Sequence, residues 1–417
     1  MARLPSPRAA LAILTGLNFL NYIDRFIPAA ILPTILSELG LSDAKGGSLQ
    51  TLFIMTFVVV SPLAGWLGDR QPRFRLAAVG VFIWSAATFG SGLAPTYAFL
   101  VAARALIGVG EASYTVVTPS LLSDFYPTSR RGSVLAIFYA AVPIGSAMGY
   151  VLGGQIAAHF GWRTAFFVAG VPGAALAALL LFLRDPPRGA QDVKAVAKKK
   201  DPATISSVVV IANAVRELVA RPSFVVNTAA QTIYTFAVGG LAVWMPTYFV
   251  RERGLPLASA ATAFGAALAL AGFVGTLLGG RLGDRLARTR ADAHFVMSGV
   301  AMVASLPFTL LAVLAPSPAI FWPAMFVDLT LLFLTTGPLN AAMANVLPAE
   351  LRGRGFAFNT MAIHLFGDAL SPFLIGVASD RVGLRLPVLG TGVLVVIAGV
   401  VLLVGRKTLA RDLGAMP

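Results

Sequence analysis

Apolar residues occur along the chain in long runs, separated by short segments that hold the charged and turn-forming residues. A helix that crosses a bilayer needs about 20 predominantly apolar residues. Runs of this length without Asp, Glu, Lys or Arg recur from the first half of the chain to the last. The pattern predicts twelve spanning helices, at about 9–36, 47–68, 75–94, 97–123, 133–158, 163–184, 223–250, 257–281, 293–315, 318–345, 355–379 and 385–405.

Composition indicates the same class. The chain is 57% hydrophobic and only 12% charged, with a mean hydropathy of +0.81, outside the range of soluble domains. We expect an all-α integral membrane protein without strands. Because there is no cysteine, disulfides, thiol chemistry and cysteine-ligated metals are excluded, and we expect neither a metal nor a cofactor. Residues 1–8 are basic and lack a following cleavage site, which indicates a retained first helix.

The orientation of the chain in the membrane explains its net charge of +14. If both termini are cytoplasmic, twenty-four of the 32 Lys and Arg residues lie in cytoplasmic segments, as the positive-inside rule requires. We therefore predict a multi-pass protein of the bacterial inner (plasma) membrane with both termini in the cytoplasm. Binding of nucleic acid is the weaker explanation of the charge, and no such partner is expected.

The longest polar interruption divides the chain. The polar character of this interruption predicts that residues 185–221 form a cytoplasmic linker. The linker would join a helical bundle at 1–184 to a second bundle at 222–417. Within the linker, apolar residues at helical spacing over 204–220 suggest an interfacial amphipathic helix. An ordinary linker helix and a sensor of lipid headgroups are the two alternatives.

The two halves repeat. The segment 65–70 (GWLGDR) ends the second predicted span and 280–285 (GRLGDR) ends the eighth, 215 residues later. A second pair of similar segments begins at Pro127 and Pro348, which are 221 residues apart. A third pair begins at Gly161 and Gly383, which are 222 residues apart. Such spacing indicates a duplicated six-helix unit. Parallel repeats with a site between them are typical of transporters.

Charged residues within two spans are the main candidates for function: Asp24 and Arg25 on the first span, and Arg104 and Glu111 on the fourth. Each costs roughly 2.5–3.5 kcal/mol at mid-bilayer, so we expect them to be paired and functional. Residues seven apart share a helix face but lie about 10 Å apart along the axis. We therefore expect pairs across the helices, Asp24 with Arg104 and Glu111 with Arg25 or Tyr22.

Small residues on the fourth span, Gly108, Gly110, Ala112 and Ser113, would let the first and fourth helices approach closely.

The repeat, the central loop and the Gly-x-x-x-Asp-Arg element after spans two and eight resemble the major facilitator superfamily over essentially the whole chain. This resemblance implies two pseudo-symmetric six-helix bundles. It also implies that the loops containing Asp69, Arg70, Asp284 and Arg285 act as gate latches. The alternative is that these loops only anchor helix ends by charge.

A narrower resemblance rests on Asn21-Tyr22-x-Asp24-Arg25 and on Arg104-x-x-x-Gly-x-Gly-Glu111-Ala-x-Tyr114. Together they look like the Spinster-like branch, whose characterised members move lysophospholipids or sphingoid phosphates, in some cases coupled to protons. The resemblance implies an amphiphilic lipid as substrate. The glycine pattern of antiporters on span five is only partly present, because its proline, Pro143, precedes the glycines.

In this interpretation Asp24 and Glu111 take up and release the coupled proton. Arg25 and Arg104 are their charge partners or bind an anionic headgroup, together with Asn21, Tyr22 and Tyr114. A pair that opens during transport leaves a buried acid that then takes up a proton. The alternative is a static ion-pair cluster that only holds the helices together.

The second half has few charges within its spans. His364 and Asp368 are four residues apart and could pair on one helix face, as a relay or as an ordinary helix contact. Asp328 could be a third polar group or could lie near a helix end. Aromatic residues such as Trp244 and Phe333 would suit an acyl tail, although such residues also face lipid.

The sequence therefore predicts a monomeric secondary transporter of an amphiphilic lipid, working by alternating access and coupled to protons, in contact with membrane lipids. A carrier of small organic anions or a drug exporter on the same fold is the alternative. An enzyme is not expected, since no nucleophile or metal motif is present. A receptor that transports nothing is a further alternative.

Overall fold

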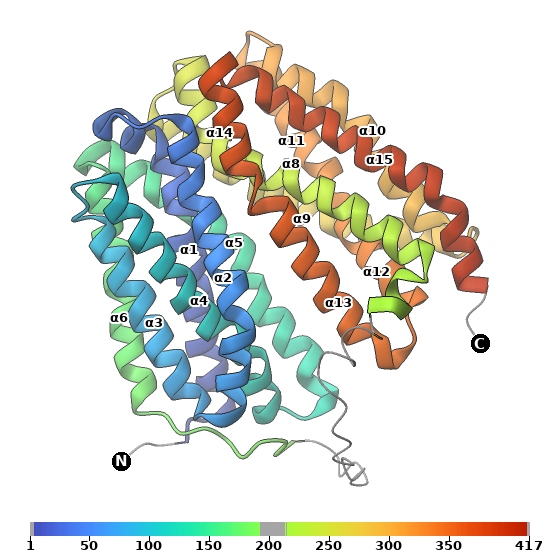
Figure 1. The fold of residues 1–417 in the computed structure, drawn as a ribbon, viewed down its shortest axis with the longest axis horizontal. Coiled ribbons are helices and arrows are strands. Elements are labelled where there is room, and N and C mark those ends of the chain that lie inside the picture. Colours follow the sequence, from blue (N-terminus) through green and yellow to red (C-terminus); the bar gives the residue numbers. More distant parts are fainter. Residues whose placement is uncertain (1–3, 192–212, 214, 415–417) are drawn as a thin grey trace. The chain divides into compact units, whose positions relative to one another are not determined.

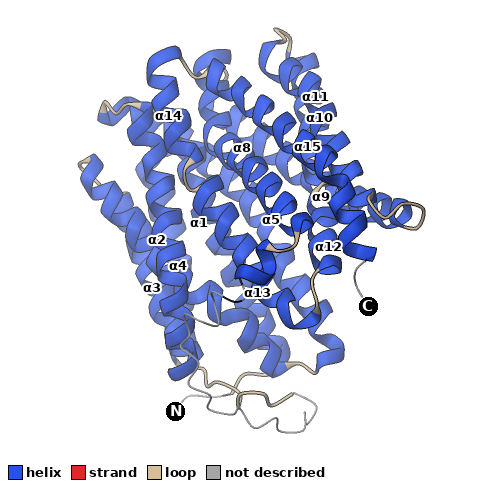
Figure 2. Cartoon of the chain, turned by 45° about the vertical axis from the view of Figure 1, so that its right-hand side comes forward, coloured by secondary structure: helices blue, strands red, loops and turns tan. Residues whose placement is uncertain are grey.

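A computed structural model describes residues 4–191, 213 and 215–414. The described chain is helical and shows no strand (Figures 1 and 2). Twelve helices in these residues are long and apolar enough to cross a membrane, as the sequence predicts. The elements are α1 (Pro7–Leu39), α2 (Asp43–Arg70), α3 (Arg73–Ser91), α4 (Tyr97–Phe125), α5 (Thr128–Phe160), α6 (Trp162–Leu181), α8 (Pro222–Arg253), α9 (Leu257–Ala287), α10 (Ala293–Leu314), α11 (Pro318–Leu334), α12 (Thr336–Val346), α13 (Ala349–Ile363), the π-helical turn η1 (His364–Asp368), α14 (Ser371–Val382) and α15 (Arg385–Gly414).

Capping residues explain where several helices begin and end. The side chain of Ser6 accepts a hydrogen bond from the Ala9 N–H at the start of α1, and Thr96 accepts one from Phe99 N–H at the start of α4. Gly40 ends α1 with φ at 59°, in the left-handed region that glycine adopts without strain. The apolar runs are thus interrupted by local signals that fix the helix boundaries.

The chain forms two compact units. Unit 1 comprises residues 1–199 and 243–266, and unit 2 comprises 200–242 and 267–417. The division predicted from the sequence instead places all of 222–417 in the second bundle, so the two divisions differ over residues 243–266.

Unit 1 is held together by close backbone contacts and an aromatic core. Its core contains Phe74, Trp84, Tyr114 and Phe138, and the rings of Trp84 and Tyr114 meet edge to face at 5.4 Å. The helix pairs α1–α5, α3–α4, α3–α6 and α2–α4 pack against each other most extensively.

Glycines on α4 and α5 set which helices of unit 1 touch. A Cβ on Gly110 would lie 2.4 Å from the Gly80 carbonyl oxygen of α3, and one on Gly108 would lie 2.6 Å from the Phe53 carbonyl oxygen of α2. The α4 glycines therefore do not bring α1 and α4 together, which corrects the expectation from the sequence. Gly149 of α5 approaches α1 instead, where an added Cβ would lie 2.7 Å from the Ile23 carbonyl oxygen.

Unit 2 has its own core, which includes Phe224, Phe295, Met302 and Leu402. One spanning segment of this unit is interrupted at Thr335, between α11 and α12. Because proline lacks a backbone N–H, Pro338 cannot donate the usual helix hydrogen bond to the Leu334 carbonyl. That carbonyl faces α9, where a Cβ on Gly279 would lie 2.0 Å from its oxygen.

The predicted linker lies mostly outside the described residues. This includes the lysine run 198–200 and most of the predicted amphipathic helix at 204–220. Its described end, residues 215–219, is helical.

Candidate functional site

A salt bridge joins α1 to α4 inside unit 1. The Nη2 atom of Arg25 lies 2.5 Å from the Oε2 atom of Glu111, and Arg25 Nε lies 3.2 Å from the same oxygen. Glu111 is fully buried, whereas the Arg25 side chain is 18% exposed. This is the cross-helix contact expected for Glu111. The second carboxylate oxygen of Glu111 has no hydrogen-bond partner among the described residues.

The buried guanidinium of Arg104 does not pair with Asp24, which corrects the second expected contact. Its Nη2 atom donates to Oε1 of Gln50 at 2.6 Å, and its Nε donates to the Leu49 carbonyl at 3.4 Å. Both partners belong to α2, a helix that sequence reasoning left out of the site. Arg104 thus keeps its charge with no carboxylate in contact, and its Nη1 has no partner in the described chain.

Both arginines lie against one aromatic ring, that of Phe53. The Phe53 ring centroid lies 5.1 Å from the guanidinium carbon of Arg25 and 4.5 Å from that of Arg104. Tyr22 and Phe57 also lie beside Arg25, at 4.9 and 5.3 Å. Cations near ring faces gain about 0.5–2 kcal/mol. The rings therefore stabilise two positive charges, of which Arg25 pairs with the carboxylate of Glu111 and Arg104 with no described carboxylate. No spacing rule in the sequence marks Phe53 or Gln50 for this role.

Asp24 and Asn21 are buried polar groups on α1 without hydrogen bonds. Neither carboxyl oxygen of Asp24 and neither side-chain polar atom of Asn21 has a partner among the described residues. The Trp84 indole lies close to the Asp24 carboxyl, but its N–H is also unpaired in this part of the chain. Leaving such groups unsatisfied costs about 1–3 kcal/mol each.

The two tyrosines of the motifs differ in position. Tyr22 lies against Arg25, the residue that pairs with Glu111. Tyr114 is buried and donates its hydroxyl hydrogen to the Leu14 carbonyl of α1 at 2.5 Å. Tyr114 therefore joins α4 to α1.

A second polar group of residues lies in unit 2, around η1. Nδ1 of His364 lies 3.0 Å from both carboxylate oxygens of Asp368, the contact that their spacing predicts. The helix is π-helical here, a geometry often found at functional sites. His364 also lines a pocket of about 290 Å³, with the polar side chains of Gln231, Asn340 and Asn359 among its walls.

Asp328 is buried within unit 2 and does not lie at a helix end. It occupies the interior of α11 and accepts a hydrogen bond from the Thr309 hydroxyl of α10 at 2.9 Å. Ser305 is a further hydroxyl beside it. Because no described cation pairs with Asp328, it forms a polar group of its own, distinct from the His364–Asp368 pair.

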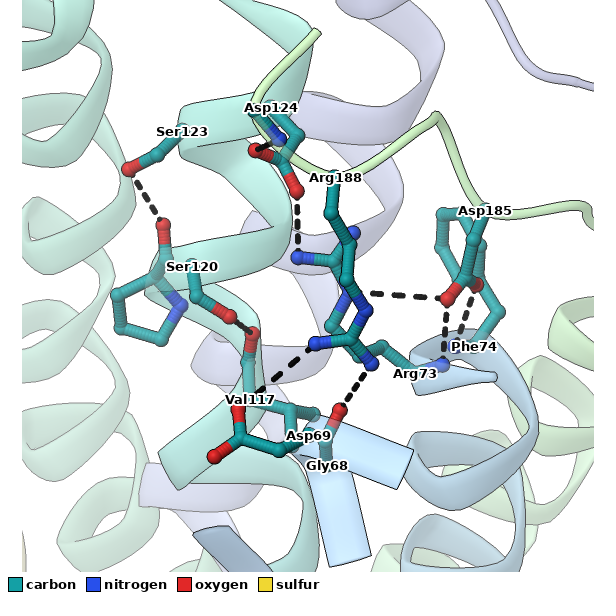
Figure 3. Close-up of polar contacts among 12 residues, drawn as sticks. Gly68, Asp69, Arg73, Phe74, Val117, Ser120, Ser123, Asp124, Asp185 and Arg188 are labelled. Carbon is teal, nitrogen blue, oxygen red and sulfur yellow. Dashed lines mark hydrogen bonds and ion pairs between the residues drawn. The ribbon is translucent and has the colours of Figure 1, made fainter. Parts of the chain in front are cut away.

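The repeated Asp-Arg loops have different surroundings. Asp69 lies 3.7 Å from Arg188, and Arg70 stacks on Trp66 with its guanidinium carbon 4.1 Å from the ring centroid (Figure 3 shows Asp69 and Arg188). Asp284 and Arg285 form no ion pair within the described chain. The described residues also contain no cluster of His, Asp and Glu that could hold a metal ion.

Comparison with known proteins agrees with this architecture. The family model described as Major Facilitator Superfamily matches residues 14–372. Protein spinster homolog 1 of Bos taurus is 35% identical over 390 residues, covering 89% of this chain and 72% of that protein. The sphingosine-1-phosphate transporter SPNS2 of Xenopus tropicalis is 33% identical over 392 residues, covering 90% of this chain and 74% of the relative.

A solved structure shares the fold. The crystal structure of a bacterial homolog to the human lysosomal transporter Spinster, in an inward-facing and unoccupied conformation, matches with a TM-score of 0.88 at 24% identity, covering 98% of each chain. The residues matched by the family model, the length and identity of the Spinster alignments and the twelve apolar helices lead to one conclusion. This chain belongs to the major facilitator superfamily and is a Spinster-like, multi-pass membrane transporter.

Proposed function

We propose that this transporter moves an amphiphilic lipid with an anionic headgroup, such as a lysophospholipid or a sphingoid phosphate, by alternating access of its two repeated halves. The observation that carries the proposal is the pair of arginines that both lie against the Phe53 ring. Among the described residues Arg25 contacts a carboxylate there and Arg104 does not, so the charge of Arg104 is available to an anionic group. The name of the Xenopus relative, a sphingosine-1-phosphate transporter, supports the same class of substrate.

Proton coupling is assigned to Glu111 and Asp24. Protonation of Glu111 would remove the charge that holds Arg25, and Arg25 could then bind a headgroup phosphate. Asp24, buried without a hydrogen bond in the described chain, is the second carboxyl able to exchange a proton. Asn21, Tyr22 and the His364–Asp368 pair are supporting polar groups in this proposal.

The loops at Asp69–Arg70 and Asp284–Arg285 are proposed gates, formed and released as the halves rock. We further propose a bacterial inner-membrane location with both termini in the cytoplasm, because the basic residues of the chain are concentrated in the segments that this orientation places inside.

Uptake by proteoliposomes tests the substrate. Labelled lysophosphatidylglycerol is compared with glycerol 3-phosphate, which has a phosphate but no acyl chain. We expect transport of the lipid only, and loss of a charge-assisted contact in Arg104→Gln should reduce uptake by about 10- to 100-fold. Equal transport of glycerol 3-phosphate would instead favour the carrier of small organic anions.

A pH gradient across the same vesicles tests the coupling. We expect the gradient to accelerate uptake by the wild type and to have no effect on Glu111→Gln or Asp24→Asn. Glu38→Gln is the matched control, because Glu38 lies on the same helix as Asp24 but is half-exposed at its far end. If both site variants retain acceleration by the gradient, the proton assignment is wrong.

A further inference from the structure

One end of unit 1 carries a network of charges that the transport site does not use. At this end, which we call the basic end, α1, α3 and α5 begin and α2, α4 and α6 end. Residues 184–190, which we call the strap, follow α6 and are bonded to three helix ends (Figure 3). Arg188 donates to the Gly68 carbonyl at 2.5 Å, and the Gly189 N–H donates to Asp124 at 2.9 Å.

The carboxylates of this network are already occupied. Asp185 of the strap accepts hydrogen bonds from the N–H groups of Arg73 and Phe74, and thereby caps the start of α3. The Arg73 side chain is 2.6 Å from Asp124 and 3.6 Å from Asp185. Figure 3 shows these contacts converging beneath the strap. Asp69 is left as a largely exposed partner of Arg188.

Arginines outnumber acids in the pocket beside the strap. This pocket, of about 700 Å³, is lined by five arginines and two aspartates. The side chains of Arg75 and Arg184 make no hydrogen bond or ion pair with any residue that the structure describes, and both are exposed. The five are Arg70, Arg73, Arg75, Arg184 and Arg188. A concave wall with excess positive charge is suited to an anion.

Apolar side chains beside the pocket place it at the edge of the lipid. Leu181, which lines the pocket, and the neighbouring Phe182 are 54% and 65% exposed. Trp66, half-exposed, stacks under Arg70. Tryptophan at a helix end and basic residues next to it are typical of the headgroup layer of a membrane. An anion in this pocket can therefore be attached to acyl chains that lie along these side chains.

We propose that this pocket binds the phosphate of an anionic lipid headgroup, held by Arg75 and Arg184 with Arg70 and Arg188 beside them. The bound phosphate would balance the positive charge of the five arginines that the two aspartates of the pocket leave uncompensated. The site is separate from the charges on α1 and α4, and its ligand is a resident membrane lipid and not the cargo.

Native mass spectrometry of the purified full-length protein tests the proposal. The probes are dioleoyl-phosphatidylglycerol, the zwitterionic dioleoyl-phosphatidylcholine, and soluble glycerophosphoglycerol. We expect retention of phosphatidylglycerol in preference to phosphatidylcholine, and roughly tenfold weaker retention in the double variant Arg75→Gln/Arg184→Gln. Failure of glycerophosphoglycerol to displace the lipid would support a lipid as the ligand. If glycerophosphoglycerol displaced the lipid at equal concentration, the ligand would be a soluble phosphate and the proposal of a membrane lipid would be wrong.

Two further variants separate loss of the site from misfolding and from a general loss of charge. Arg281→Gln/Arg288→Gln removes the same charge from exposed positions in unit 2 and should retain the lipid like the wild type. Arg75→Lys/Arg184→Lys keeps the charge and should recover most of the retention, which a merely misfolded variant would not do. Equal loss in the unit 2 control, or equal retention of the two lipids by the wild type, would overturn the proposal.

Discussion

At the scale of single residues, the site is a set of buried charges that is not balanced pair by pair. Glu111 is bound to Arg25, Arg104 is bound to neutral groups of α2, and Asp24 is bound to nothing in the described chain. Breaking a buried ion pair costs more than never forming one, because the remaining charge is left unsatisfied. The contributions of Arg25 and Glu111 to stability are therefore expected to be strongly non-additive.

A double-mutant cycle tests this coupling. Glu111→Gln should lower the thermal unfolding midpoint in detergent, because Arg25 keeps its charge without a carboxylate. In Arg25→Gln/Glu111→Gln both charges are absent, so part of the loss should be recovered, with a coupling energy of about 0.5–3 kcal/mol. Additive losses would mean that the 2.5 Å contact contributes nothing to stability.

The Phe53 ring gives a second prediction at this scale. Phe53→Leu keeps an apolar side chain but removes the aromatic ring that both arginines contact. We expect destabilisation of about 0.5–2 kcal/mol per lost cation–π contact, beyond that of Phe138→Leu, a buried control without a described cation–π contact. Equal unfolding midpoints for the two variants would argue that the ring acts only by its volume.

At the scale of the helix, contact between backbones explains the tight packing of unit 1. The Gly80 and Gly110 backbones of α3 and α4 are so close that no side chain fits between them. In membranes, helices gain little free energy from burying apolar surface against each other. Close packing at such a seam of small residues therefore provides much of the free energy of helix association. The seam also fixes the rotation of α4 that directs Glu111 toward Arg25.

Substitution in the seam should separate α3 from α4. A methyl group at Gly110→Ala would lie 2.4 Å from the Gly80 carbonyl oxygen, so the helices must move apart, at a cost of about 1–3 kcal/mol. Gly132→Ala, on an open surface of α5, has nothing within 4 Å and should be neutral or slightly stabilising. The unfolding midpoint should therefore fall in Gly110→Ala and hold or rise in Gly132→Ala.

At the scale of the whole molecule, the sequence predicts the number of spans and their approximate limits because a bilayer imposes both length and apolarity on each helix. It also predicts that Glu111 of the fourth span meets a partner on the first, which is Arg25. It does not predict that Arg104 binds α2, since the rotation of α4 depends on the contacts of Gly108 and Gly110 with neighbouring helices. Phe53 and Gln50 escape notice because nothing in their own segment distinguishes them from ordinary lining residues.

Orientation is the remaining prediction at this scale, and the absence of cysteine makes it simple to measure. Single cysteines are introduced at Ala190 and Thr289, in loops predicted to be cytoplasmic, and at Ala158, at the opposite end of α5. With a membrane-impermeant maleimide added to intact cells, we expect only Ala158→Cys to react. Labelling at Ala190→Cys or Thr289→Cys before lysis would reverse the assigned orientation.

The π-helical turn η1 has a consequence for how this chain tolerates changes in length. A π-turn holds one residue more than an α-helical turn, so the insertion of a residue is absorbed locally. In a regular α-helix the same insertion would rotate everything beyond it by about 100°. Related sequences are therefore expected to gain or lose a single residue at 364–368 more readily than inside α3 or α4.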